Sequence, residues 1–404
     1  MTKYHTSTPP TPSFFEGVVA FLYFLLYNLI MSIIQQIFSD HFNDVVDSGI
    51  SIRPAVFDNV NKMLHCGDYK FGYTLFSCNH CGKFKMVPFS CKSRFCNSCG
   101  NMYSIKRSSA MSFKLLRTSH RHCVFTIPEE LRIYFRADRS LLNCLFRAVA
   151  DSILFVFRKL NKSENFTPSF ICVLHTFGRS LQWNPHIHVL LSEGGSGNTS
   201  PWRVVKYFPY ELLRKSFRML LLNYMEDTIG KSFRKVKAYI YKNCPNGFYV
   251  YAKPSLTSNQ DVLKYIGRYL GRPVIATSRI DSYDGQNVTF HYNRHEDEQL
   301  VTETVSAIEF IKMLIIHIPD KHFKMIRYYG LYAKHHKHES KLSLAISNQK
   351  RRLLASALAW RSSLLSSFGY DPLLCKCGHT MTIFEICLKG SPLIEFYRKI
   401  SDSS

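Results

Sequence analysis

The chain has 404 residues, enough for two or three domains with buried cores. Its 46% hydrophobic and 14% aromatic content is typical of globular proteins and excludes a disordered chain. The formal charge of +23 indicates a polyanionic partner, with nucleic acid favoured over an anionic membrane surface. Thirteen cysteines in a chain of this size and charge favour a reducing cytoplasm over a secreted disulfide scaffold.

An apolar stretch near the start, residues 14–34, is nearly long enough to span a bilayer. It lacks the basic flank and the small-residue cleavage site of a signal peptide. From Ser32 onward the chain becomes an ordinary amphipathic helix. We therefore expect the functional protein to begin near Met31, with residues 1–30 a translated extension and no membrane association; a true membrane anchor is the alternative.

Helices and a cysteine-rich segment follow. Residues 32–64 predict two helices with a break at residues 51–54, where Ser51 and Pro54 mark the second start. Residues 69–77 and 83–89 read as strands between the cysteine pairs Cys78-x-x-Cys81 and Cys96-x-x-Cys99. These two pairs, about fourteen residues apart, have the spacing of a zinc ribbon. We predict one structural zinc on these four cysteines, closed to substrate and without a chemical role.

Two further cysteines, Cys66 and Cys91, are left over from this ribbon. A second ion shared with His65 or His80 would account for them, and so would burial as simple thiols. Basic residues on and just after the two Cys-x-x-Cys loops are predicted to contact the phosphate backbone of DNA. A merely solvated basic surface is the alternative. They are Lys83, Lys85, Lys92, Arg94, Lys106 and Arg107.

The middle of the chain predicts a strand at residues 122–127, a long helix at 131–159 and a strand at 170–176. The loop at 178–182 then leads into a strand that begins at Trp183. In that strand His186 and His188 share one face, while Ile187, Val189 and Leu191 share the other. Two imidazoles side by side on a rigid strand are suited to hold a metal ion; solvated or core histidines are the alternative.

A third ligand follows from pairing the two strands as a hairpin. The turn lies midway between His175 and His186, so His175 is the preferred partner of the pair. Gln182 and Glu193 compete for the position, and a register slip of one residue would turn His175 away.

Basic residues alternate with aromatic ones in the segment that follows, from a helix at residues 210–227 to Lys242. This pattern suits single-stranded nucleic acid, whose exposed bases stack on aromatic rings. Core aromatic residues beside a solvated face would give the same pattern.

A short helix of about three turns is predicted from Ser258, with a stop signal at Gly271 and Pro273. It places Tyr265 and Tyr269 one above the other on one face. Tyrosines at this spacing are commonly core residues. Beside a metal site, however, a tyrosine hydroxyl can attack a DNA phosphodiester, and a second tyrosine one turn away permits a second strand transfer. The chain has no G-x-x-x-x-G-K-[ST] loop, which agrees with a reaction that needs no nucleotide.

Several ordered segments, from about Gln35 to Met381, resemble the zinc-bearing, two-tyrosine rolling-circle transposases of bacterial insertion sequences, in the HUH endonuclease group. The segments are SCKSRFCNSC (90–99) after Cys78-x-x-Cys81, HCVFTIPEELR (122–132), VLHTFGRSLQWNPHIHVLLSEGG (173–195), YIGRYLGRP (265–273), IRYYGLYA (326–333) and DPLLCKCG (371–378). The resemblance implies that His186 and His188 bind Mg²⁺ or Mn²⁺, that Tyr265 and Tyr269 are nucleophiles, and that the zinc module recognises the ends of the element. It implies cleavage and rejoining of single-stranded DNA in the cytoplasm, at the nucleoid.

The expected fold is α+β, with an N-terminal zinc ribbon before an HUH-type catalytic domain whose central antiparallel sheet is flanked by helices. The predicted divisions are residues 1–30 (extension), 31–115 (zinc-binding DNA recognition), 116–345 (catalytic) and 346–404 (helical, cysteine-containing tail). Predicted DNA contacts are Lys92, Arg94, Arg268 and Arg272.

The tail departs from the family. Cys375-Lys376-Cys377 is Cys-x-Cys where the family more often has Cys-x-x-Cys, which argues against a C-terminal metal knuckle unless His379 substitutes. The histidine-rich tract at 334–338 is interpreted as a basic DNA-contacting surface. Two other functions fit the same chain: a plasmid-type replication initiator with the same chemistry, and a non-catalytic zinc-dependent DNA-binding regulator.

Overall fold

The structure is a computed structural model that describes residues 31–112, 115–116, 118–160, 164, 166–197, 202–205, 208–252, 269, 273–294, 296–333, 359, 361–362, 364–365, 369, 371–388 and 391–392. The predicted extension at residues 1–30 and the histidine-rich tract at 334–338 lie outside these residues.

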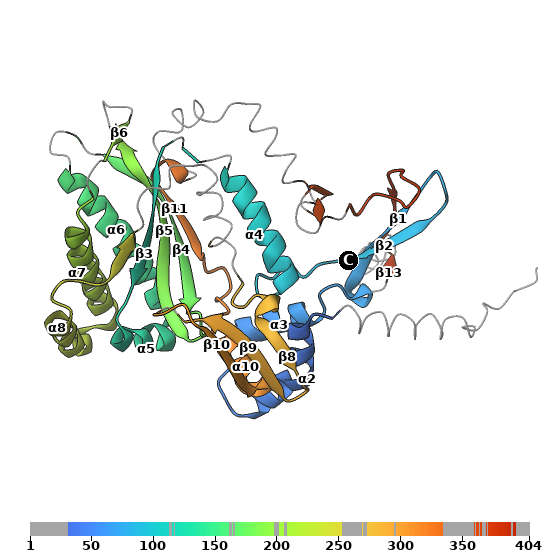
Figure 1. Ribbon diagram of the computed structural model, residues 1–404, viewed down its shortest axis with the longest axis horizontal. Helices are drawn as coiled ribbons and strands as arrows, with labels where there is room; N and C mark the ends of the chain where they lie inside the picture. Colours follow the sequence, from blue (N-terminus) through green and yellow to red (C-terminus); the bar gives the residue numbers. More distant parts are fainter. Residues whose placement is uncertain are drawn as a thin grey trace, which may run out of the picture.

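The largest sheet in the described part of the chain is antiparallel, with the order β11-β4-β5-β3-β7 and β6 paired to β5 (Figure 1). Its strands are β3 (His120–Thr126), β4 (Thr167–Phe177), β5 (Trp183–Ser196), β6 (Arg203–Val204), β7 (Val250–Ala252) and β11 (Ile326–Tyr329). The prediction of an antiparallel sheet that carries the histidines is thus confirmed.

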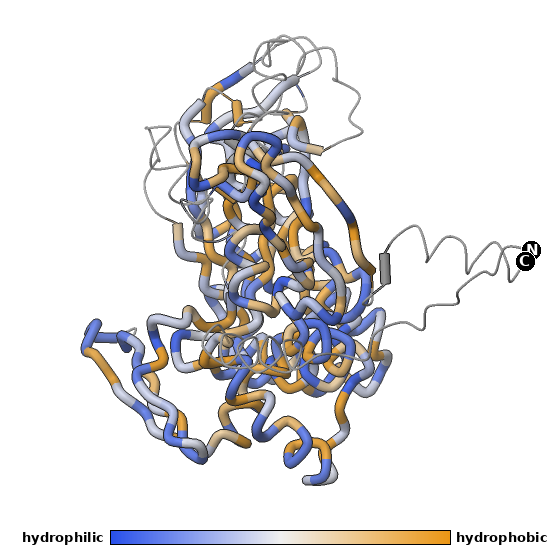
Figure 2. The backbone as a smooth tube through the Cα atoms, turned by 90° about the vertical axis from the view of Figure 1, so that its right-hand side faces the viewer, coloured by the Kyte–Doolittle hydropathy of each residue, from blue (hydrophilic) through white to orange (hydrophobic). Residues whose placement is uncertain are grey.

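Helices gather on one side of this sheet, where they bury its apolar face (Figure 1). Ile187, Val189 and Leu191 of β5 point into this core and are at most 1% exposed, as their alternation with the histidines predicts. The covering helices are α5 (Glu129–Ala137), α6 (Leu142–Leu160), α7 (Tyr210–Ile229) and α8 (Arg234–Asn243). Along the backbone, hydrophobic and hydrophilic residues alternate, as in elements with one buried face (Figure 2).

The long helix predicted at residues 131–159 is in fact two helices. Asp138 adopts an extended conformation, ends α5, and accepts a hydrogen bond at 2.8 Å from the backbone N–H of Ser140. A short aspartate that bonds the backbone locally competes with the helical pattern. Among the described residues, one helical segment, Arg139–Leu160, is long and apolar enough to cross a membrane; it is the core helix that lies against the sheet, with Leu145, Phe146 and Val149 fully buried.

A second core joins the N-terminal helices to a segment far along the chain. The first helix begins after Ser32 and the second opens at Pro54, as predicted; the structure adds that Ser32 caps the first helix with Gln35 in a capping box. These helices pack on a three-stranded sheet, order β10-β9-β8, and on one further helix. The elements are α2 (Ile33–Asp47), α3 (Pro54–Leu64), β8 (Ile280–Tyr283), β9 (Asn287–Asn293), β10 (Leu300–Ser306) and α10 (Ala307–Ile315).

The predicted ribbon strands form a smaller sheet with the order β13-β12-β1-β2, set apart from the large sheet (Figure 1). Its strands are β1 (Gly72–Ser77), β2 (Phe84–Pro88), β12 (Thr382–Leu388) and β13 (Ser391–Pro392). The sequence did not predict that a tail strand, β12, pairs with β1. Helix α4 (Asn97–Ser112) runs from this region towards the large sheet (Figure 1), where Met111 packs against Ile171, Val173 and Leu190. Short 3₁₀ turns complete the fold at Tyr69–Phe71 (η1), Arg139–Leu141 (η2), Lys231–Phe233 (η3), Thr277–Arg279 (η4) and Gly330–Tyr332 (η5).

Candidate functional site

Three histidines meet on the face of the large sheet opposite to the helical core. In the β4–β5 register His175 lies directly across from His186, as the hairpin argument predicts. His188 follows on the same face of β5, next to Val173 of β4 and Val124 of β3. One ring nitrogen from each of His175, His186 and His188 lies within 4.8 Å of the others.

Hydrogen bonds orient the two histidines of β5. His186 Nδ1 lies 2.7 Å from the carbonyl oxygen of Asn184. Because a carbonyl can only accept, Nδ1 carries the proton and the lone pair of His186 lies on Nε2. That Nε2 lies 3.1 Å from the Nε2 of His188, so both imidazoles point towards the same small volume. This is the arrangement of paired nitrogen ligands.

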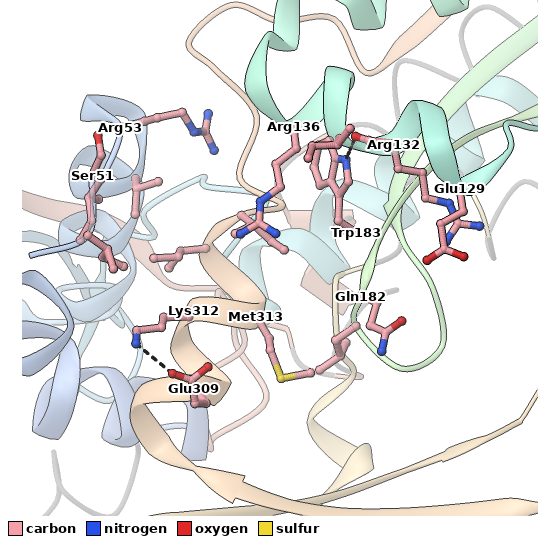
Figure 3. A pocket seen from close by; sticks show the side chains of 17 residues that line it. Ser51, Arg53, Glu129, Arg132, Arg136, Gln182, Trp183, Glu309, Lys312 and Met313 are labelled. Carbon is pink, nitrogen blue, oxygen red and sulfur yellow. Dashed lines mark hydrogen bonds and ion pairs between the residues drawn. The ribbon is translucent and has the colours of Figure 1, made fainter. Parts of the chain in front are cut away.

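The competing third ligands are engaged elsewhere. Glu193 forms an ion pair with Arg121 at 2.7 Å. Gln182 lines a cavity of about 710 Å³ between α5, α10 and the segment before α3, together with Trp183 and Arg132 (Figure 3). His175 is therefore the third residue that the structure brings to the histidine pair.

Tyr269 lies over the three histidines. Its ring centroid is 4.2 Å from that of His188 and 6.0 Å from that of His175. Its carbonyl oxygen accepts a hydrogen bond from His175 Nε2 at 2.9 Å. The residue singled out from the sequence thus reaches the histidine face. The other predicted nucleophile, Tyr265, and the predicted DNA contacts Arg268 and Arg272 lie outside the described residues.

His122 is a neighbour of the site to which the sequence analysis gave no role. Its Nε2 lies 3.1 Å from His188 Nδ1, and its ring centroid is 5.1 Å from that of Tyr269. It shares its face of β3 with Val124, which pairs with His188. The signal was in the sequence, because His122 is followed by Cys123 and Phe125 on the opposite, buried face, just as Ile187 and Val189 lie opposite His186 and His188.

Further along the same face of the sheet lies a buried pair of side chains. His120 Nε2 and the hydroxyl of Tyr332 are 2.5 Å apart, and Tyr332 also accepts from the backbone N–H of Leu116 at 3.3 Å. Burial lowers the pKa of His120 to about 4 and raises that of Tyr332. Both side chains are therefore neutral at physiological pH, and they tie the region after α4 to η5.

The structure corrects the predicted grouping of the cysteines. Cys78 and Cys81 do not share a site with Cys96 and Cys99; each pair belongs to a separate cluster of four thiols. The β1–β2 hairpin is the physical reason. Cys78 and Cys81 lie in its turn, whereas the other cluster lies at its open end, and six strand residues at about 3.3 Å each separate the ends by roughly 20 Å.

The first cluster unites Cys66 and Cys91, left over in the sequence analysis, with Cys96 and Cys99. Cys99 Sγ lies 3.6 Å from both Cys66 Sγ and Cys91 Sγ. Hydrogen bonds from Cys66, then Cys91 and Cys96, lower the pKa of the Cys99 thiol. Cys99 also lies in the first turn of α4, where the helix dipole favours a thiolate. All thirteen cysteines of the chain are free thiols, so no disulfide competes for these sulfurs.

The second cluster unites Cys78 and Cys81 with Cys375 and Cys377 of the tail. Hydrogen bonds from the backbone N–H groups of Cys81 and His80 lower the pKa of the Cys78 thiol to about 6. The Cys-x-Cys spacing of the tail therefore does place two thiols at a common point, contrary to the expectation from the sequence.

A cavity of about 720 Å³ lies between the first cluster and the edge of the histidine site. Lys92 and Arg94, both predicted DNA contacts, line it beside His175. Lys92 is exposed, whereas the guanidinium of Arg94 packs over the ring of Tyr103 at 4.9 Å, and burial lowers its pKa. Lys92 is thus a more accessible cation for a phosphate than Arg94.

Comparisons with known proteins agree with both regions. Residues 37–127 match the family described as "Transposase zinc-binding domain", and residues 169–340 match the family described as "Putative transposase". The chain is 29% identical over 297 residues to the transposase for insertion sequence element IS801 of Pseudomonas savastanoi pv. phaseolicola, across 70% of this chain and 71% of that protein. It is 30% identical over 298 residues to "Putative transposase y4qJ" of Sinorhizobium fredii, across 69% and 74% respectively. No solved structure matches the chain significantly.

The two matched ranges coincide with the chemistry described above. The first contains the whole cluster of Cys66, Cys91, Cys96 and Cys99, and the second contains the three histidines and Tyr269. The chain therefore belongs to the zinc-binding, rolling-circle transposase family of bacterial insertion sequences, with the IS801 transposase among its relatives.

Proposed function

We propose that the chain cleaves single-stranded DNA at the ends of an insertion sequence by attack of Tyr269 on a phosphodiester. The observation that carries this proposal is the contact of Tyr269 with His188, at 4.2 Å between ring centroids, on the face that holds three histidines. Attack of the phenolic oxygen on phosphorus leaves a covalent phosphotyrosine and a free 3′-hydroxyl. Since the phosphotyrosine bond conserves the energy of the cleaved phosphodiester, rejoining of the strands needs no nucleotide cofactor.

The histidine face suits a divalent ion. The lone pair of His186 lies on Nε2 because Nδ1 donates to Asn184, and the candidate ligand nitrogens of the three residues lie within 4.8 Å of one another. Three nitrogen ligands leave coordination positions open for water and phosphate oxygens, which are the ligands that Mg²⁺ and Mn²⁺ prefer. We propose that His186 and His188, with His175, hold Mg²⁺ or Mn²⁺, which when bound supplies Lewis acidity at the scissile phosphate.

The surrounding residues have distinct tasks in this proposal. His122 and the carbonyl of Asn184 fix the ring orientations of His188 and His186. The contact between His175 and the backbone of Tyr269 holds the nucleophile beside the metal ligands. Tyr265, one helical turn earlier in the predicted helix, serves as the second nucleophile that permits strand transfer.

The remaining parts of the chain are proposed to bind the DNA and position it at the histidine face. We propose that the first cysteine cluster holds a structural zinc within a DNA-recognition domain, and that Lys92 contacts phosphate at the cavity beside His175. The large sheet with its covering helices would be an HUH-type catalytic domain. A DNA transposase of this kind acts in the cytoplasm, where the bacterial chromosome lies.

A nicking assay tests the proposal directly. The full chain is incubated with Mn²⁺ and a labelled single strand that carries an element end, and a covalent protein–DNA band is scored on a denaturing gel. We expect Tyr269→Phe either to abolish cleavage and joining or to separate one activity from the other, without loss of DNA binding. We expect His188→Ala to abolish the covalent band. Tyr249→Phe, at an exposed tyrosine on the same protein, is the matched control and should retain activity. Full strand transfer by the double variant Tyr265→Phe/Tyr269→Phe would refute the assignment, and DNA binding without any nicking by the wild type would favour a regulator.

A further inference from the structure

A second four-thiol cluster lies only partly within residues 37–127, the range that matches the zinc-binding family, because two of its cysteines belong to the tail. Cys78 and Cys81 come from the turn of the β1–β2 hairpin, and Cys375 and Cys377 from the tail. The sulfurs of Cys78 and Cys377 are 3.5 Å apart, as are those of Cys81 and Cys375, although 294 residues separate the latter pair. Zinc–sulfur bonds of about 2.3 Å in a tetrahedron place the sulfurs about 3.8 Å apart, so this cluster has the dimensions of a zinc site.

The two contributing loops have matching backbones. In the hairpin turn, Gly82 has a φ of +70° and donates its N–H to the carbonyl of Cys78 at 2.9 Å. In the tail, Gly378 has a φ of +86° and donates to the carbonyl of Cys375 at the same distance. A positive φ after the last cysteine turns each loop back on itself, a conformation that glycine adopts without strain. Both loops are therefore built as metal knuckles, even though the tail has one residue fewer between its cysteines.

The small sheet has little else to hold it together. Its buried hydrophobic cluster consists of Phe76, Cys78, Cys375 and Met381, so two of its four members are the thiols themselves. Large apolar side chains of the same sheet face solvent, with Phe84 58% and Phe384 61% exposed. A sheet with so small a core needs a metal or a covalent link to be stable, and its cysteines are free.

We infer that Cys78, Cys81, Cys375 and Cys377 bind a second structural zinc ion, which fastens the tail to the N-terminal module. This site is separate from that of Cys66, Cys91, Cys96 and Cys99, so the chain holds two zinc ions and the tail completes the zinc-binding region. The ion keeps β12 paired with β1 across the length of the chain. His379, whose Nδ1 lies 3.7 Å from Cys377 Sγ and whose ring stacks on His80 at 3.8 Å, supports the thiolates without replacing one.

Metal content of the purified full chain tests the inference. We expect two zinc ions per wild-type chain by elemental mass spectrometry, and one in the double variant Cys375→Ser/Cys377→Ser. Cys144→Ser/Cys244→Ser, at cysteines outside both clusters, is the matched control and should keep two, as should His379→Ala. The inference would be overturned if His379→Ala lost zinc, if Cys375→Ser/Cys377→Ser still held two zinc ions, or if the wild type held a single zinc ion.

A second measurement on the wild type covers the case in which the tail variant does not fold. Cys81 and Cys377 are both exposed, so burial cannot protect them from alkylation. We expect both to resist N-ethylmaleimide in the zinc-loaded protein and to react together once a chelator removes the metal, with the sites identified by mass spectrometry. Rapid modification of Cys81 and Cys377 in the zinc-loaded protein would refute the site. Neither measurement depends on DNA cleavage, so the outcome is independent of the proposed catalytic function.

Discussion

The hydrogen bond between His122 and His188 offers the sharpest test of how the histidine face works. For His188 Nε2 to ligate a metal, its Nδ1 must carry the proton and donate it to His122 Nε2, 3.1 Å away. His122→Phe keeps an aromatic ring beside His188 and Tyr269 but removes this acceptor. The substitution therefore isolates the hydrogen bond from the packing.

The expected magnitude follows from burial. Both His122 and His188 are only 7% exposed, so water cannot readily replace the lost acceptor. Loss of a residue that orients a metal ligand typically weakens metal affinity about 10- to 100-fold, or about 1.4–2.7 kcal/mol. Because the pair is buried, we expect the upper half of this range, with the maximal rate at saturating metal close to that of the wild type.

The assay is single-strand nicking as a function of Mn²⁺ concentration, which separates metal affinity from maximal rate. His122→Gln, which keeps a hydrogen-bonding side chain, should recover part of the affinity. His291→Phe, at a histidine that bonds to Asp281 in the three-stranded sheet, is the control and should leave the Mn²⁺ dependence unchanged. An unchanged Mn²⁺ midpoint in His122→Phe, or a rate that no Mn²⁺ concentration restores, would refute the orienting role.

Three further predictions concern stability. Leu145→Ala empties part of the fully buried core beneath the sheet and should lower the free energy of unfolding by about 2–5 kcal/mol in urea titrations; a smaller loss would mean that α6 is not packed as described. Gly330→Ala should lower it by more than about 1 kcal/mol, because Gly330 has a φ of +60° and a Cβ there would lie 2.1 Å from the carbonyl oxygen of Pro168; a melting temperature equal to that of the wild type would contradict this contact. Burial lowers the pKa of His317 from 6.5 to about 4, so the unfolded chain binds more protons between these values, and stability should fall by about 3 kcal/mol as the pH drops from 7 to 4. His317→Gln should reduce this pH dependence without removing it, because the pKa of His120 is lowered to about 4 as well; an equally steep dependence in that variant would exclude His317 as a source.

The histidine face was largely predictable because its information is local. The alternation of His186 and His188 with buried residues fixed which side of β5 they occupy. The short turn between β4 and β5 then set the register, so that His175 could be placed opposite His186 before the fold was known. His122 carried the same alternation, but its strand reaches β5 from far along the chain, and nothing local shows that β3 is the neighbour of β5.

Helix starts were predictable where the amphipathic pattern or a proline marks them. Ser32 and Pro54 placed the starts of α2 and α3. The break at Asp138 was missed, because apolar residues continue at helical spacing on both sides of it, and the aspartate's bond to its own backbone decides the local conformation.

Sequence alone determined the residue types and their local placement: pairs of cysteines at metal-binding spacing and two histidines on one strand face. Only the tertiary structure decided which cysteines belong together. The spacing of Cys78-x-x-Cys81 and Cys96-x-x-Cys99 permits one shared site, but the β1–β2 hairpin holds these pairs at opposite ends. Their true partners are Cys66 and Cys91 for one pair, and two cysteines almost 300 residues away (294 for Cys81 and Cys375) for the other. Spacing constrains ligands only within a loop, whereas a site assembled from distant segments is set by the pairing of strands.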